Sequence, residues 1–263
     1  MIEHSNTINE GGDFGIEMER TYRLSERFVI PYHKDGFEHI RQSHLYESTD
    51  VKGLVEWVAI KIHNTIHKLE LTDDDFDQYI MLLLSIVERV EEKFSDTENY
   101  TSYKMRVRVK DRSEWILTVK WKRKDSSDET KIHGELNIII PIRYAVFLLT
   151  KIWVPPPEII ISKKSNKAQW IIKTRHRILG KDGKTWQLDR YLGRNSGLVT
   201  AEVELWSPEE QVALLDPGMI QIRGTDAKPF NVKNLQMYPY GEWSDEERIR
   251  FQNPSPVQVH HAH

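Results

Sequence analysis

Polar and apolar residues alternate along most of this chain, which is the pattern of β-strands that are buried on one face only. The clearest example is the segment 197–205, where Val203 and Leu205 point one way while Glu202 and Glu204 point the other. The alternation predicts eight strands, at residues 16–24, 37–46, 103–110, 114–124, 131–140, 168–178, 185–192 and 197–205. We therefore expect an α+β protein that is mainly β.

Helical periodicity replaces this alternation between about residues 50 and 95. Apolar side chains there recur every three to four positions in two stretches. We expect a helical hairpin inserted between two strands, and a partner or a second copy of the chain could bind to it. Further helices are expected after Pro141 and at 207–210, where a serine cap precedes proline. The expected organisation is a flexible leader at 1–14, a single domain at 15–240 and a polar tail at 241–263.

Composition excludes several classes of protein. The 37 basic and 40 acidic residues leave a net charge of only −3, so bulk attraction to nucleic acid or to a membrane is not expected. Cysteine is absent, which excludes disulfides, thiolate zinc sites and cysteine nucleophiles. No apolar run approaches the roughly 20 residues of a membrane span, and no basic-then-apolar segment opens the chain. We expect a cytoplasmic protein.

Charge is segregated onto one face of most of the expected strands. Alternate positions are basic in 106–110, 120–124 and 173–177, and acidic in 17–19 and 202–204. Two folds satisfy this pattern. One is a sandwich whose charged faces are solvated. The other is a closed antiparallel barrel whose charged faces line the interior, where opposed walls of Arg/Lys and Glu suit a polyphosphate bound with divalent cations.

Several motifs follow one another in a characteristic order. They are Glu17-Met18-Glu19, Arg106-Val107-Arg108, the segments 117–120, 173–177, 186–189 and 197–205, and Asn234-Leu235 followed by Pro239-Tyr240. This order resembles the CYTH superfamily, the triphosphate tunnel metalloenzymes, over residues 15–240 apart from 50–95. The resemblance implies a closed eight-stranded antiparallel β-barrel with a charged lumen, outer helices and the inserted hairpin. Members of the family include inorganic triphosphatases, thiamine triphosphatases and class IV adenylyl cyclases.

The resemblance also implies the residues of the site. The catalytic and metal-binding carboxylates would be Glu17, Glu19, Glu202 and Glu204, with Glu135 as a further metal ligand. The phosphates would be held by Arg106, Arg108, Lys120, Lys122, Lys173, Arg175 and Arg177, with Asp189 near the second end of the site. The cofactor would be Mg²⁺ or Mn²⁺. His133 is expected to be structural.

Four positions depart from the family pattern. The family signature is E-x-E-x-K, and Thr21 stands in place of its lysine. Asn137, Ile139 and Gln187 stand where acidic residues are usual. The basic wall is therefore retained better than the acidic wall.

We expect a divalent-metal-dependent phosphohydrolase that cleaves the terminal phosphate of a small-molecule triphosphate, either inorganic or part of a nucleotide or thiamine ester. One enzymatic alternative is a class IV-type nucleotidyl cyclase, which would bind the triphosphate with the same residues and form a cyclic nucleotide. The other is an RNA 5′-triphosphatase. A non-catalytic triphosphate or nucleotide sensor is a further alternative, because several acidic ligands are replaced. A structural barrel with solvated charged faces would bind no phosphate.

Overall fold

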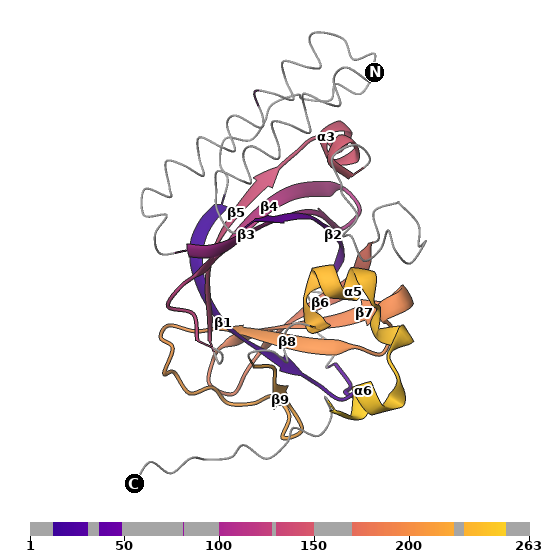
Figure 1. Ribbon diagram of the computed structural model, residues 1–263. Helices are drawn as coiled ribbons and strands as arrows, with labels where there is room; N and C mark the ends of the chain where they lie inside the picture. Colours follow the sequence, from indigo (N-terminus) through magenta and orange to yellow (C-terminus); the bar gives the residue numbers. More distant parts are fainter. Residues whose placement is uncertain are drawn as a thin grey trace.

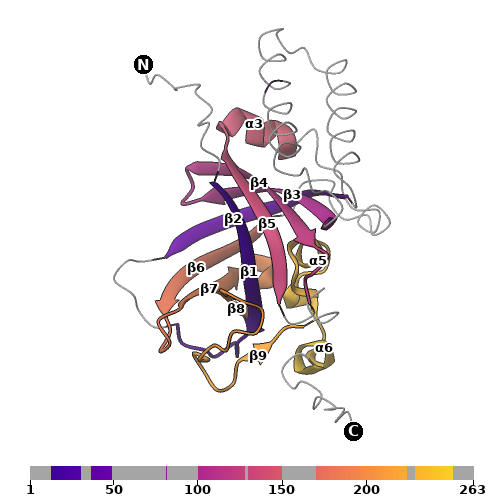
Figure 2. The same ribbon diagram turned by 90° about the vertical axis from the view of Figure 1, so that its left-hand side faces the viewer.

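The computed structural model describes residues 13–30, 37–48, 81, 100–127, 130–149, 170–223 and 229–250. The helical hairpin expected at 50–95 lies outside the described residues apart from Met81, so it stays a prediction. The first twelve residues of the expected leader and the end of the tail beyond Arg250 also lie outside them. Figures 1 and 2 show the described elements in two views at right angles.

Nine strands form one antiparallel sheet that closes on itself. They are β1 (Asp13–Arg23), β2 (Glu38–Ser48), β3 (Tyr100–Lys110), β4 (Glu114–Arg123), β5 (Lys131–Ile139), β6 (Ile171–Leu179), β7 (Thr185–Leu192), β8 (Val199–Glu204) and β9 (Ile220–Gln221). Their order is β5-β4-β3-β2-β6-β7-β8-β1-β9, and β5 also pairs with β1. Eight strands therefore make a ring, visible end-on in Figure 1, and the alternative of two packed sheets is wrong.

All eight strands expected from the alternation occur, with small shifts at their ends. β1 begins at Asp13, which pairs with Asn137, so the last two residues of the expected leader belong to a strand. The two-residue β9 was not expected, because two residues are too few to show an alternating pattern. It pairs with β1 at Tyr22 and Arg23 and adds a short edge outside the ring.

The apolar faces of β1, β7 and β8 turn outward, and one cluster shows what covers them. There the buried Trp186, Leu188 and Val203 pack with Met219 of the segment that follows β8. A second cluster joins the inward face of β6 and β7 to the C-terminal elements and contains Ile171, Tyr191, Leu198, Ile222, Phe230, Leu235, Tyr240 and Trp243. Burial of this apolar surface, at roughly 25 cal/mol per Å², holds the ring and its coverings together.

The described helices are short. They are α3 (Ile142–Phe147), α5 (Val232–Met237), α6 (Asp245–Arg250) and the 3₁₀ turns η3 (Gly193–Asn195) and η5 (Tyr240–Glu242). α3 and α6 lie on opposite sides of the ring in both views (Figures 1 and 2). Trp243 is only 5% exposed, so packed residues continue past residue 240, where the polar tail was expected to begin. None of the helices in the described ranges has the length and apolar character needed to cross a membrane.

The helix expected at 207–210 does not form, and Arg20 explains why. Its guanidinium donates to the carbonyl oxygens of Pro208 and Glu210, the latter at 2.6 Å. The Glu210 carboxylate turns back to accept the N–H of Trp206 at 2.6 Å. A side chain from a distant strand therefore takes the backbone acceptors that a helix would have used, and the segment is a series of turns.

Candidate functional site

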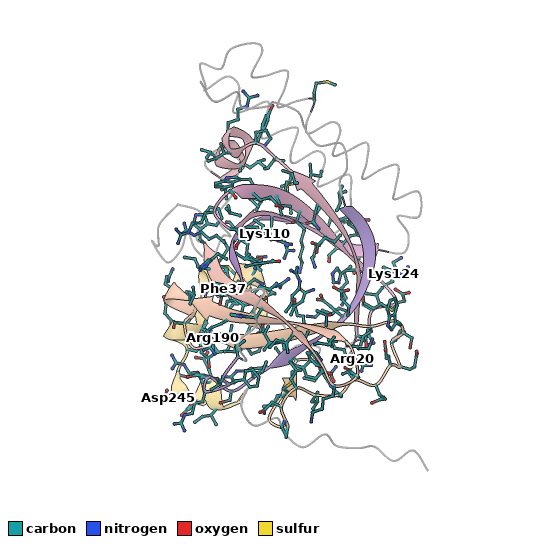
Figure 3. The ribbon with its side chains drawn as sticks, turned by 180° about the vertical axis from the view of Figure 1, so that it is seen from behind. Arg20, Phe37, Lys110, Lys124, Arg190 and Asp245 are labelled. Atoms are coloured by element: carbon teal, nitrogen blue, oxygen red, sulfur yellow. The ribbon has the colours of Figure 1, made fainter. Side chains whose placement is uncertain are left out.

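The interior of the ring is a cavity of about 630 Å³ with a positively charged lining. Within the described part of the chain, the charged lining consists of ten basic side chains and four acidic ones. They are Lys104, Arg106, Arg108, Lys120, Lys122, Lys131, Lys173, Arg175, Arg177 and Lys233, and Glu19, Glu135, Glu202 and Glu204. Figure 3 shows the side chains that fill the ring between its two sides. A cavity with this excess of cations attracts a polyanion.

Most of the residues expected in the site do meet in this cavity. Among the described side chains, Asp189 is the exception. Glu17 lies on β1 opposite His133, and its side chain is outside the described residues. Asp189 was expected near the second end of the site, but its carboxylate lies behind the basic wall and is 1% exposed.

Asp189 holds two cations of the wall in place. Arg175 donates from Nε to Oδ1 and from Nη2 to Oδ2, both at 2.7 Å, and Lys173 also binds Oδ2. Burial opposes the ionisation of Asp189, but the positive charges of Arg175 and Lys173 outweigh it and hold its pKa well below the usual range. Such a forked pair fixes the guanidinium plane as well as its charge. Asp189 therefore acts as a buried counter-ion that positions two cations of the cavity wall.

Lys173 has an altered proton affinity in this environment. Burial and, after it, the positive charge of Arg175 lower the pKa of Lys173 to about 8, although Asp189 acts in the opposite direction. The Lys173 ammonium also lies 5.7 Å from the ring centre of Tyr191. Near pH 8 this part of the wall begins to lose positive charge.

Glu135 is the counter-ion of a second basic cluster. Its carboxylate lies 3.2 Å from Nη2 of Arg108 and 3.4 Å from Nη2 of Arg106, and it also contacts the Lys120 ammonium. Asn137 donates its amide to Oε1 of Glu135 at 2.9 Å. In this arrangement Glu135 orients cations, as Asp189 does across the ring, and the neutral Asn137 adds no further negative charge.

The acidic side of the cavity is formed by β1 and β8. Glu19 is in register with Glu204, and Thr21 is in register with Glu202. Burial disfavours the ionised form of Glu19, but Lys120, His133 and Lys131 outweigh this effect and lower its pKa to about 2. Glu202 is held by Arg175 at 3.2 Å, and Glu204 accepts a hydrogen bond from Gln187 at 3.1 Å.

These carboxylates have the donor chemistry of a magnesium or manganese site. Within the described residues, no three metal-binding side chains converge on one point. Mg²⁺, however, is usually held by only one or two carboxylates together with substrate phosphates and water. Glu19 and Glu204, neighbours on adjacent strands, fit that requirement once a phosphate supplies the other ligands.

Several cavity residues were missed by sequence reasoning. Lys104 shares its strand face with Arg106 and Arg108, and Lys131 shares its face with Glu135, so the period of two could have identified both. His133, which was expected to be structural, also lines the cavity. Its Nε2 lies 2.8 Å from Nζ of Lys120 and 3.9 Å from Oε2 of Glu19.

Comparison with known proteins gives one local sequence match. No family model matches the chain. An inorganic triphosphatase of Acetivibrio thermocellus is 36% identical over 64 residues, which is 24% of this chain and 40% of that protein. The match therefore spans less than half the length of the relative. The name of this relative agrees with the resemblance that the order of motifs indicates.

Three solved structures are similar in arrangement at low sequence identity. Two are of NE1496, described in one case as an inorganic triphosphatase and in the other as a hypothetical protein. Each has a TM-score of 0.41 and 16% identity, and covers 84% of this chain and 94% or 97% of its own. The third is HpAC1 from Hippeastrum, described as an adenylyl cyclase candidate with a dominant triphosphatase activity. Its TM-score is 0.34 and its identity 14%, over 73% of this chain and 81% of its own.

Proposed function

We propose that this protein is a divalent-metal-dependent triphosphatase that works inside a closed β-tunnel. The observation that carries the proposal is the division of one enclosed cavity into two sides. Buried carboxylates organise two clusters of cations, around Asp189 and Glu135. Three glutamates, Glu19, Glu202 and Glu204, line the opposite side. A triphosphate bound with a divalent cation needs both kinds of wall.

The basic clusters would bind and orient the triphosphate. Arg175 and Lys173 would hold one group of phosphate oxygens, while Arg106, Arg108 and Lys120 would hold another. Because Asp189 and Glu135 already fix these cations, little reorganisation is needed when the substrate binds. Phosphoryl transfer depends almost entirely on such positioning and on neutralising the charge of the transferring group.

The acidic side would hold the cation. Glu19 and Glu204 are the best placed, with Glu202 and Glu17 as further proposed ligands. Glu135, which was also expected to bind the metal, is instead the counter-ion of the second basic cluster. A bound Mg²⁺ or Mn²⁺ would supply charge neutralisation and polarise the terminal phosphoryl group. With its pKa near 2, Glu19 is ionised and ready to bind a cation over the whole neutral range.

The test compares the wild type with Glu202→Ala/Glu204→Ala and with Glu209→Ala, an exposed glutamate outside the cavity. Each protein is incubated with inorganic triphosphate, ATP, GTP or thiamine triphosphate, in Mg²⁺, in Mn²⁺ or in a chelator. We expect metal-dependent phosphate release by the wild type and by Glu209→Ala, and loss of that release in the double variant. Release that is unaffected by the double substitution would refute the proposed site.

The second candidate function is that of a nucleotidyl cyclase, which acts on an organic triphosphate. The observation in its favour is that Ile222, Phe230 and Val232 also line the cavity and could contact a base or another organic group. The same incubations separate the two activities, because a hydrolase releases the terminal phosphate of the triphosphate. A cyclase releases pyrophosphate and forms cyclic nucleotide. Binding of inorganic triphosphate without either product would instead support a sensor.

A further inference from the structure

Lys131 brings an ammonium group to the position where the E-x-E-x-K signature has lost its lysine. Nζ of Lys131 donates to Oγ1 of Thr21 at 2.8 Å. It lies 3.9 Å from Oε1 of Glu19, so the threonine hydroxyl is the nearer partner. Both Lys131 and Thr21 line the cavity.

The pairing of β1 with β5 explains this contact. Lys131 is directly opposite Glu19, which makes Thr21 its diagonal neighbour on the same face of the sheet. Diagonal neighbours in an antiparallel pair are about 7–8 Å apart, within reach of a long side chain. Lysine has such a side chain, with four carbons, and threonine is short enough to leave room for its ammonium group.

We propose that the Lys131 ammonium and the Thr21 hydroxyl form a phosphate-binding pair that replaces the missing lysine of the signature. This inference rests on the proposed function, because it assumes that a triphosphate occupies the cavity. An ammonium group carries three donors, and Thr21 accepts one of them. The side chain of Lys131 is 37% exposed, so a ligand in the cavity can reach it.

The location gives this pair a role that the two basic clusters do not fill. Thr21 is in register with Glu202 and lies beside Glu19, on the side of the cavity that carries the acidic groups. Phosphate oxygens brought close to these glutamates meet negative charge. A cation placed among the carboxylates offsets that repulsion and lets the phosphate chain approach them. Lys131 is therefore a substrate-binding residue of the acidic side.

The test measures hydrolysis of inorganic triphosphate and its binding by calorimetry in four proteins. They are the wild type, Lys131→Met, the relocated-lysine variant Thr21→Lys/Lys131→Met, and Lys124→Met as the matched control. Lys124 follows β4 in the same hairpin, is exposed and does not line the cavity. Figure 3 labels it at the edge of the ring. Thermal unfolding verifies that each variant is folded.

We expect Lys131→Met to lower kcat/KM about 10- to 100-fold, mainly through a higher KM, since a hydrogen bond from a charged donor is lost. Lys124→Met should stay within about twofold of the wild type. The relocated lysine should recover most of the loss, which a merely structural role for Lys131 would not allow.

Two results would overturn the inference while leaving the proposed function intact. One is an active wild type together with a kcat/KM of Lys131→Met that is no lower than that of Lys124→Met. The other is a relocated-lysine variant that is folded but no better than Lys131→Met. If the wild type binds inorganic triphosphate without hydrolysing it, the proposed function fails, and the same comparison of dissociation constants still decides the role of Lys131. A wild type that neither binds nor hydrolyses it removes both.

Discussion

Replacing Asp189 by asparagine should destabilise this protein strongly, although the two side chains have the same shape. The substitution keeps the hydrogen-bonding outline but removes the negative charge between Lys173 and Arg175. Asp125 provides a matched comparison in the same chain. Its carboxylate also receives a forked pair of bonds, from Nε of Arg123 at 2.9 Å and from Nη2 at 2.7 Å. The two pairs share their geometry and differ in burial.

Burial sets the expected size of the two effects. The Asp189 side chain is 1% exposed and its partners 6% and 14%, whereas Asp125 is 53% exposed and Arg123 31%. Removing one partner of a buried ion pair costs about 3–5 kcal/mol, because the remaining charges are left without compensation. An exposed pair contributes about 1 kcal/mol or less. We therefore expect Asp189→Asn to lower the unfolding midpoint by roughly 6–20 °C and Asp125→Asn to lower it by a few degrees at most.

Thermal unfolding gives the midpoints, and urea unfolding at pH 7 with linear extrapolation gives the free energies of unfolding. Both are measured on the two single variants and on Asp189→Asn/Lys173→Met. The double variant removes one of the two uncompensated cations, so it should be more stable than Asp189→Asn alone. Equal losses for Asp189→Asn and Asp125→Asn would refute the reasoning, since burial would then make no difference. A double variant less stable than Asp189→Asn would show that uncompensated charge is not the cause.

Three further predictions concern single positions. The pKa of Glu19 is about 2 in the folded protein against an ordinary 4.5. Ionised Glu19 therefore contributes about 3 kcal/mol to the free energy of unfolding. This contribution is present above pH 4.5 and is lost as the pH falls toward 2. When unfolding is measured at a series of pH values, Glu19→Gln should lose less stability at low pH than the wild type. An equal loss in the two proteins would contradict the prediction. Wild-type kcat/KM should fall as the pH rises through about 8, because Lys173 loses its charge. The decline should be absent in Lys173→Arg, and an identical limb would assign it to another group. Gly134→Ala should lower the free energy of unfolding in urea by about 1–3 kcal/mol. The reason is that a Cβ at this position would lie 1.9 Å from the buried Trp121 ring. An unchanged midpoint would show that the ring can move.

Local patterns were sufficient to predict the eight strands of the ring and most of the charged residues that face the cavity. The alternation from Arg106 to Arg108 and from Glu202 to Glu204 places each pair on one face, whatever the rest of the fold does. The structure then brings these faces together inside the ring. The prediction of a helix at 207–210 was wrong because a contact from a distant part of the chain overrides the local pattern. Its signature is local, but Arg20 from β1 takes the backbone acceptors that the helix needed.

The sequence by itself determined which side chains share a face, because successive residues of a strand point to opposite sides of the backbone. It also determined the types of charge available, including a threonine where the signature has lysine. The tertiary structure alone decided the partner of each charge, since partners come from residues far apart in the chain. Pairing of β1 with β5 closes the ring and brings Lys131 to Thr21. Pairing of β6 with β7 buries Asp189 behind Lys173 and Arg175, where a low dielectric makes their charges interdependent.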